Sequence, residues 1–290
     1  MNFTKMHGTG NDFILIEVNR EHDWSQLAKV MCDRHFGIGA DGLLLLLPSK
    51  TADSQMRMFN PDGSEAEACG NGIRCLAKYV LDEGLLKNSG KDIPDGISVQ
   101  TMSGVSKLKL QKIGNETRIQ ADMGIPQFEA KDIPVILQKD TEKIMDIKPM
   151  LGYPIAIDGL EMTLNFVSMG NPHAVCFWNQ PISDFPLAQI GLRVEHLGLF
   201  PNRVNFEIAH VVDNKQIEAR IWERGVGETL ACGTGACAIA VAAHLHGCVG
   251  NIVDIKVPGG ILQVEWDGTR KVFLSGSAET VFTGEWKGMV

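Results

Sequence analysis

The chain has 290 residues, of which 44% are hydrophobic and 21% charged, and its formal net charge is −8. These values are typical of a globular protein with one large or two ordinary domains, and they argue against nucleic-acid binding, which requires concentrated lysine and arginine. No apolar run reaches the length of a membrane span and the N-terminus lacks a hydrophobic signal core, so we expect a cytoplasmic protein that binds neither membrane nor nucleic acid.

The first half of the chain combines strand patterns with two helix patterns. A glycine turn at residues 8–10 separates two strands, and Gly84 ends the second helix, which follows the phrase Ala68-Cys69-Gly70-Asn71-Gly72. The expected elements are two strands within 2–18, helices at 24–32 and 71–83, strands at 43–47 and 55–59, a loop at 85–97, and alternating strands as far as residue 123.

The second half begins with a proline-containing stretch at 124–154, a candidate connection between domains. It then repeats the cysteine phrase as Ala231-Cys232-Gly233-Thr234-Gly235, at the start of a helix that Gly247 ends. The expected elements are strands at 163–167, 174–178, 204–212 and 216–222, a helix at about 233–246, and short strands over 251–283.

The two cysteine phrases belong to a longer repeat. Measured from each cysteine, an arginine lies 12 residues before it, a glutamate 4 before it and the helix-ending glycine 15 after it. Gly-Asn turns precede Cys69 by 58 residues and Cys232 by 61, at Asn11 and Asn171. We interpret the chain as two homologous halves related by pseudo-two-fold symmetry. Each half should be a mixed α/β unit rich in antiparallel strands, because the strand–helix alternation of a doubly wound sheet is missing.

A cysteine at the start of a helix is suited to proton transfer. The positive end of the helix dipole should lower the thiol pKa, and the glycines expose backbone N–H groups that bind a carboxylate. Two such helix starts predict a two-base racemase or epimerase. One cysteine, as thiolate, removes an α-proton, and the other, as thiol, protonates the opposite face. The backbone donors stabilise the charge that develops on the carboxylate.

The remaining cysteines have a simpler interpretation as small buried residues in a reducing compartment. They are Cys32, Cys75, Cys176, Cys237 and Cys248. The pairs Cys69/Cys75 and Cys232/Cys237 lack the spacing of zinc ligands, so we expect no metal site. The turn at 8–10 lacks the third glycine of a dinucleotide-binding loop.

Five polar positions near the cysteine phrases have two interpretations each. Asn11 and Asn171 are either turn residues or ligand-binding residues, and their matched placement favours the second. Glu223 and Arg224 follow a strand directly, so substrate contact competes with a surface ion pair. His173 is either a packed core residue or a group that orients or deprotonates a thiol.

The sequence resembles the diaminopimelate epimerase family. The resemblance rests on MHGTGNDF (6–13), FNPDGSEAEACGNGIRC (59–75), MGNPHAV (169–175), WERGVGETLACGTGACA (222–238) and LSGSAETVFTGEW (274–286). It implies a pyridoxal-phosphate-independent isomerase without a cofactor, which interconverts LL- and meso-diaminopimelate for lysine and peptidoglycan synthesis. It further implies two pseudo-symmetric α/β domains, each a β-rich barrel-like sheet around a central helix, in a homodimer. The domains would comprise residues 1–123 with 277–290, and residues 124–276.

The resemblance also assigns roles to residues. Cys69 and Cys232 would be the catalytic bases, with His173 and Glu223 assisting. The substrate-binding residues would be Asn11, Asn60, Gly70, Asn71, Asn171, Asn205, Glu223, Arg224, Gly233 and Thr234. One departure concerns Gly42, where some family members have Gln. A side-chain contact with substrate would be missing there.

Three alternatives stay open at this stage. A proline or hydroxyproline racemase would use the same pair of thiols on a smaller substrate, without needing Arg224 or Asn205. A thiol-redox or metal-storage protein would use the cysteines for a disulfide or a metal. A non-enzymatic protein would bind an amino acid and keep that binding without its thiols.

Overall fold

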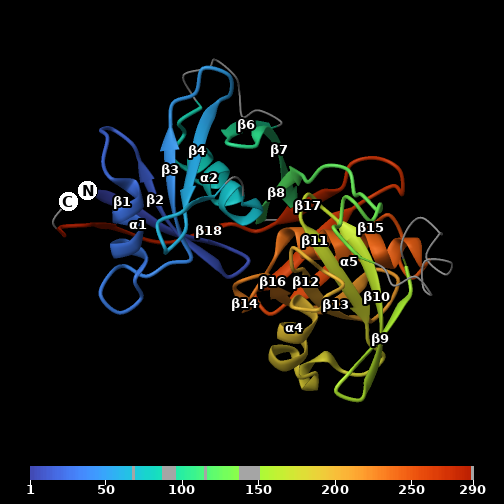
Figure 1. Cartoon of the computed structure of the whole chain (residues 1–290). Helices are drawn as coiled ribbons and strands as arrows, with labels where there is room; N and C mark the ends of the chain where they lie inside the picture. Colours follow the sequence, from blue (N-terminus) through green and yellow to red (C-terminus); the bar gives the residue numbers. More distant parts are fainter. Residues whose placement is uncertain (67–68, 87–95, 114–115, 137–150, 289–290) are drawn as a thin grey trace. The chain divides into compact units, whose positions relative to one another are not determined.

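The computed structural model describes residues 1–66, 69–86, 96–113, 116–136 and 151–288. Ala68, most of the loop predicted at 85–97 and part of the predicted connection at 124–154 lie outside the described residues. The chain forms two compact units, which are Met1–Asp122 with Ser275–Val290, and Met123–Leu274. Figure 1 labels the helices and strands of both units.

Unit 1 has the elements that the sequence predicts, with ends that differ by a few residues, and one short strand, β5 (Glu65–Ala66), that was not predicted. They are β1 (Asn2–Gly8), β2 (Asn11–Glu17), α1 (Trp24–Cys32), β3 (Gly42–Leu47), β4 (Ser54–Phe59), β5, α2 (Gly70–Asp82), β6 (Gly96–Thr101), β7 (Gly104–Ile113), β8 (Glu116–Asp122) and β18 (Glu279–Glu285). Gly84 has a φ of 64° directly beyond α2, the left-handed conformation in which glycine commonly ends a helix.

The sheet of unit 1 runs β18–β1–β2–β3–β4–β6–β7–β8. The β2–β3 and β4–β6 pairs are parallel, and the others are antiparallel. Helix α2 contacts seven strands of this order, which are β18, β1, β2, β3, β4, β6 and β8. A sheet that surrounds one helix buries the helix's apolar face on several sides, as the predicted fold class requires.

Unit 2 has the same plan. Its elements are β9 (Tyr153–Ile157), β10 (Leu160–Ser168), β11 (Pro172–Phe177), the 3₁₀ helix η2 (Ile182–Asp184), α4 (Leu187–Glu195), β12 (Asn205–Val211), β13 (Gln216–Glu223), β14 (Gly227–Thr229), α5 (Gly233–Leu245), β15 (Ile252–Val257), β16 (Gly260–Glu265) and the first residues of β17 (Phe273–Gly276). Helix α5 contacts β10, β11, β12, β15 and β16. The α/β fold class of a β-rich sheet around a central helix is confirmed.

The repeat extends beyond the sequence matches to the register of the strands. In unit 1 the parallel pair β2–β3 sets Phe13 opposite Gly42, and in unit 2 the parallel pair β11–β12 sets His173 opposite Asn205. Each pair of strands is linked through a helix, α1 in one unit and α4 in the other. The two units therefore share one order of elements, and corresponding positions can be compared directly.

Helix α4 is absent from the sequence prediction. It follows Pro186 without a side-chain cap, and Gly191 at its centre is a residue that disfavours helix formation. A Cβ at Gly191 would lie 2.7 Å from Cγ of Trp222, so the packing of this indole requires glycine. The helix is thus determined by tertiary contact instead of local propensity.

The stretch predicted as a connection contributes to unit 2. Gln127 forms an antiparallel bridge with Ser168, and Ile133 and Val135 are buried in the apolar core beside β10 and β12. Among the described helices, none has the length and apolar character needed to cross a membrane.

The matched arginines and glutamates form equivalent ion pairs. In unit 1, Arg57 donates to Glu65 through Nε at 2.6 Å and Nη2 at 3.0 Å. In unit 2, Arg220 donates to Glu228 through the same atoms at 2.8 and 3.0 Å. In each unit the arginine lies on a long strand, β4 or β13, and the glutamate lies on the short strand that follows, β5 or β14. The ion pair therefore holds the turn between these two strands, shortly before the cysteine.

Arg220→Lys should destabilise unit 2 more than Arg57→Lys destabilises unit 1, by about 1–2 kcal/mol. The reason is that Nη1 of Arg220 also donates to the carbonyl oxygens of Ile182 and Phe185, at 2.8 and 2.9 Å. Lysine cannot reproduce this fork of donors. Hydrogen exchange resolved by unit measures the effect, and equal losses in the two units would contradict the assignment.

Candidate active site

Both repeated cysteines occupy the N-cap position of a helix. Cys69 precedes α2 and Cys232 precedes α5, with extended backbone at φ −147° and −129°. Sγ of Cys69 accepts the Gly72 N–H at 3.3 Å. The first N–H groups of a helix have no partner within it, so each cysteine stands beside a set of backbone donors.

The environment of Cys232 corrects one expectation. Burial, followed by the nearby Glu223 carboxylate, raises the pKa of the Cys232 thiol well above its ordinary value, against an opposing hydrogen bond from Thr234. The helix start therefore does not lower this pKa as predicted. Cys232 is a thiol at neutral pH, and its thiolate has to be generated.

Around Cys69, unit 1 assembles two carboxamides. The Asn11 Oδ1 atom lies 4.0 Å from Sγ of Cys69 and accepts from Nδ2 of Asn71 at 3.1 Å. Oδ1 of Asn71 in turn accepts from Nη2 of Arg74 at 2.7 Å. Arg74 is fully buried and also donates to the Gly70 carbonyl at 3.1 Å. Sequence reasoning did not single out Arg74, although a charged residue on the apolar face of a predicted helix was a visible signal.

Around Cys232, unit 2 forms a chain of side chains. The Thr234 hydroxyl lies 3.4 Å from Sγ of Cys232 and accepts from Nδ2 of Asn171 at 3.2 Å. Nε2 of His173 lies 3.0 Å from Oδ1 of Asn171, and Nδ1 lies 2.6 Å from Oε1 of Glu207. The structure thus brings together four residues that the sequence predicted for this site, Cys232, Thr234, Asn171 and His173.

Glu207 was missed by the sequence analysis. His173 and Glu207 are both 0% exposed, and burial raises the pKa of the Glu207 carboxyl while the neighbouring His173 opposes this. Its Oε2 atom has no hydrogen-bond partner within the described part of the chain. The sequence carries no signal for it, because a glutamate in a strand such as 205–211 is ordinarily expected to face solvent.

The turn at Glu223 and Arg224 is held from two sides. The backbone N–H of Arg224 donates to Oδ1 of Asn205 at 2.8 Å, and Nδ2 of Asn205 donates to the Pro172 carbonyl at 3.0 Å. Oε1 of Glu195 accepts from the Gly225 N–H at 3.0 Å. Asn205 therefore ties the turn to β11, and Glu195 is a second anchor that the sequence analysis did not identify.

Two further positions concern unit 1. Asn60 forms a turn in which its Nδ2 atom donates to Oγ of Ser64 at 2.9 Å. At Gly42, a Cβ would lie 3.0 Å from Cε of Met58 and 3.2 Å from the Phe59 carbonyl. A glutamine at this position would require these neighbours to move.

The other cysteines separate into two kinds. Cys32, Cys75, Cys176 and Cys237 are buried, and burial raises the pKa of Cys32 to about 12 and of Cys176 to about 11. These residues are core packing, as predicted. Cys248 is exposed, so its prediction as a small buried residue is wrong. It lies just beyond Gly247, where the chain leaves α5, and the turn directs it outward.

The family model described as diaminopimelate epimerase matches residues 3–129 and 165–281. A diaminopimelate epimerase from Desulfovibrio desulfuricans is 45% identical over 290 residues, covering 99% of this chain and 98% of its own. The chain belongs to the diaminopimelate epimerase family. One from Methanococcus maripaludis is 42% identical over 289 residues, covering 98% of this chain and 99% of its own. The resemblance drawn from the motifs is confirmed, and with it the isomerase class.

Solved structures support the fold assignment for this member of the diaminopimelate epimerase family. A phenazine biosynthesis protein of the PhzF family from Bacillus anthracis superposes with a TM-score of 0.72 at 18% identity, over 98% of each chain. A hydroxyproline epimerase from Agrobacterium vitis gives 0.66 at 14% identity, over 98% of this chain and 91% of its own. At these identities the likeness concerns the fold alone.

Proposed function

We propose that this chain epimerises LL-diaminopimelate to meso-diaminopimelate by a cofactor-independent two-base mechanism, in lysine and peptidoglycan biosynthesis. The single observation that carries the proposal is the duplicated N-cap cysteine, Cys69 in one unit and Cys232 in the other, within a chain of this family. The two units act as the two halves of the epimerase. The protein works as a cytoplasmic homodimer on a small amino-acid substrate.

The chemistry follows from the surroundings of the two thiols. One cysteine, as thiolate, removes the α-proton, and the other, as thiol, delivers a proton to the opposite face of the carbon. The electron pair left at carbon spreads into the adjacent carboxylate. Backbone N–H groups at Gly70 and Asn71, and at Gly233 and Thr234, stabilise that charge. The reverse reaction exchanges the protonation states of the thiols.

The remaining polar residues hold the rest of the substrate. Arg224 offers a guanidinium that binds the distal carboxylate in a bidentate manner. Asn11, Asn60, Asn171, Asn205 and Glu223 bind the other polar groups. His173 and Glu223 assist the thiols. The raised pKa of Cys232 makes such assistance necessary, because its thiolate is otherwise scarce at neutral pH.

Proton exchange in deuterated water tests this function. With diaminopimelate and no added cofactor, solvent deuterium should enter the α-carbon as its configuration inverts, and NMR together with chiral chromatography measures both. Turnover of proline without turnover of diaminopimelate would refute the assigned substrate. Activity that depended on a metal or on a reversible disulfide would favour the thiol-redox class instead.

A further inference from the structure

The hydrogen bonds beside Cys69 form a chain whose direction is fixed at both ends. It begins at the Arg74 guanidinium, which can only donate, and passes through Asn71 and Asn11. It ends at the Asp41 carboxylate, which can only accept and receives Nδ2 of Asn11 at 2.7 Å. Each carboxamide between these ends has one allowed orientation, because a flip would set two donors or two acceptors against each other.

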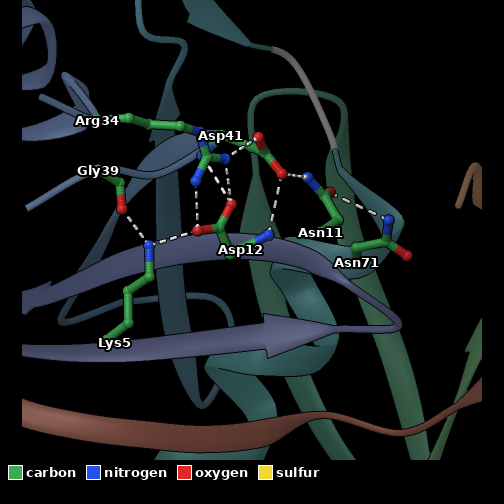
Figure 2. Close-up of polar contacts among 7 residues, drawn as sticks. All are labelled: Lys5, Asn11, Asp12, Arg34, Gly39, Asp41 and Asn71. Atoms are coloured by element: carbon green, nitrogen blue, oxygen red, sulfur yellow. Dashed lines mark hydrogen bonds and ion pairs between the residues drawn. The ribbon is translucent and has the colours of Figure 1, made fainter. Parts of the chain in front are cut away.

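Asp41 is itself held in place by charged groups of unit 1 (Figure 2). Its Oδ1 accepts from Nη2 of Arg34 at 2.6 Å, and its Oδ2 also accepts from the Asp12 N–H at 3.1 Å. Arg34 grips both oxygens of Asp12, and Lys5 donates to Asp12 at 2.5 Å. Although burial opposes its ionisation, the hydrogen bonds from Arg34 and Lys5 hold the pKa of Asp12 well below its ordinary range. Two cations and two carboxylates thus form a neutral, fixed support.

Asp41 determines which atom of Asn11 faces the thiol. Because Nδ2 is drawn to Asp41, Oδ1 is the atom 4.0 Å from Sγ of Cys69. A carbonyl oxygen can accept an S–H group but offers nothing to a thiolate. The orientation of Asn11 therefore favours the protonated form of Cys69 and opposes the Gly72 N–H, which donates to the same sulfur at 3.3 Å and favours the thiolate.

The corresponding chain in unit 2 has no carboxylate bonded directly to its carboxamide. Asn171 corresponds to Asn11, but it lies between His173 and Thr234, and both of these can donate or accept. The position that corresponds to Asp41 is Val204, which is buried and apolar. Asn171 therefore lacks the carboxylate partner that Asn11 has in Asp41.

We propose that Asp41 is a positioning residue that fixes the Asn11 oxygen toward Cys69 and so keeps Cys69 as the thiol in the resting protein. The inference rests on the proposed function, in which Cys69 is one of the two acid–base groups. Asp41 acts through Asn11 and does not itself touch the thiol.

Alkylation by iodoacetamide at pH 7, followed for each cysteine by mass spectrometry, tests this role. In Asp41→Asn the side chain can donate as well as accept, so Asn11 loses its required direction. Cys69 should then alkylate about threefold to tenfold faster, as expected for the loss of one hydrogen bond to the thiol form. Asp41→Ala should give the same direction of change, while Cys232 and the exposed Cys248 keep their rates as internal references.

Arg34→Gln is the matched control. It breaks the ion pairs with Asp12 and Asp41 but leaves Asp41 as the acceptor, so the rate at Cys69 should stay at the wild-type value. Equal acceleration in Arg34→Gln and Asp41→Asn would show a merely structural role and overturn the proposal, as would an unchanged Cys69 rate in both Asp41 variants. Failure of the wild-type protein to epimerise diaminopimelate would refute the proposed function. The alkylation rates would still decide separately whether Asp41 positions Asn11.

Discussion

Cys69→Ala and Cys232→Ala should each lower kcat for diaminopimelate inversion by at least about a hundredfold, the usual scale for loss of one acid–base group. Inversion requires one group to remove a proton and a second to return one on the other face. Neither thiol replaces the other, because each belongs to a separate helix start. Inversion followed by circular dichroism or chiral chromatography measures the loss.

Two buried cysteines provide the controls for these variants. Cys32→Ala and Cys176→Ala remove a thiol from the core of unit 1 and of unit 2, respectively. Both should keep kcat near the wild-type value while lowering the free energy of unfolding. Near-normal inversion by either Cys69→Ala or Cys232→Ala would contradict the two-base mechanism.

The repeat could be predicted because the features that define it depend on residues close together in the sequence. A small-residue turn, a helix start and a helix-ending glycine leave direct marks in the sequence, and these marks recur at equal offsets from Cys69 and Cys232. Arg57 and Arg220 lie at such equal offsets, and the structure pairs each with the glutamate that lies four residues before its cysteine. Family motifs supplied the candidate site residues, most of which lie near one cysteine or the other.

The missed residues depend on contacts between distant parts of the chain. From the sequence, Asp41 is a turn residue directly before a strand. Only the β2–β3 register shows that it lies beside Asn11. Glu207 reads as a surface residue of a strand until its neighbour His173 is known. The pKa of Cys232 was mispredicted because the helix start was visible in the sequence, whereas the burial and the Glu223 carboxylate were not.

Comparison of the two units isolates what the buried His173–Glu207 pair contributes. The strand registers match His173 to Phe13 and Glu207 to Leu44, and all four side chains are fully buried. The same fold thus fills these positions with apolar side chains in unit 1. A buried polar pair is at best weakly stabilising relative to apolar residues of similar size. The pair in unit 2 is therefore better explained by the chain of hydrogen bonds that leads from it to Cys232.

The double variant His173→Phe/Glu207→Leu places in unit 2 the residue types that unit 1 has at the corresponding positions. It should separate the effect of this pair on stability from its effect on activity. Its free energy of unfolding should stay within about 1 kcal/mol of wild type or rise, because no buried polar group is left without a partner. Its kcat should fall by about a hundredfold, since Asn171 loses the group that sets its orientation toward Thr234. Urea unfolding and the inversion assay measure the two effects on one preparation.

The single variant His173→Phe supplies the contrast. It leaves Glu207 buried without its partner, and this should cost roughly 3 kcal/mol of stability. If the double variant kept wild-type kcat, the pair would have no part in the reaction. If instead it were as unstable as His173→Phe alone, the correspondence with Phe13 and Leu44 would be wrong. A stable but inactive double variant would place the requirement for this pair in the chemistry at Cys232, because the unit would then fold without it.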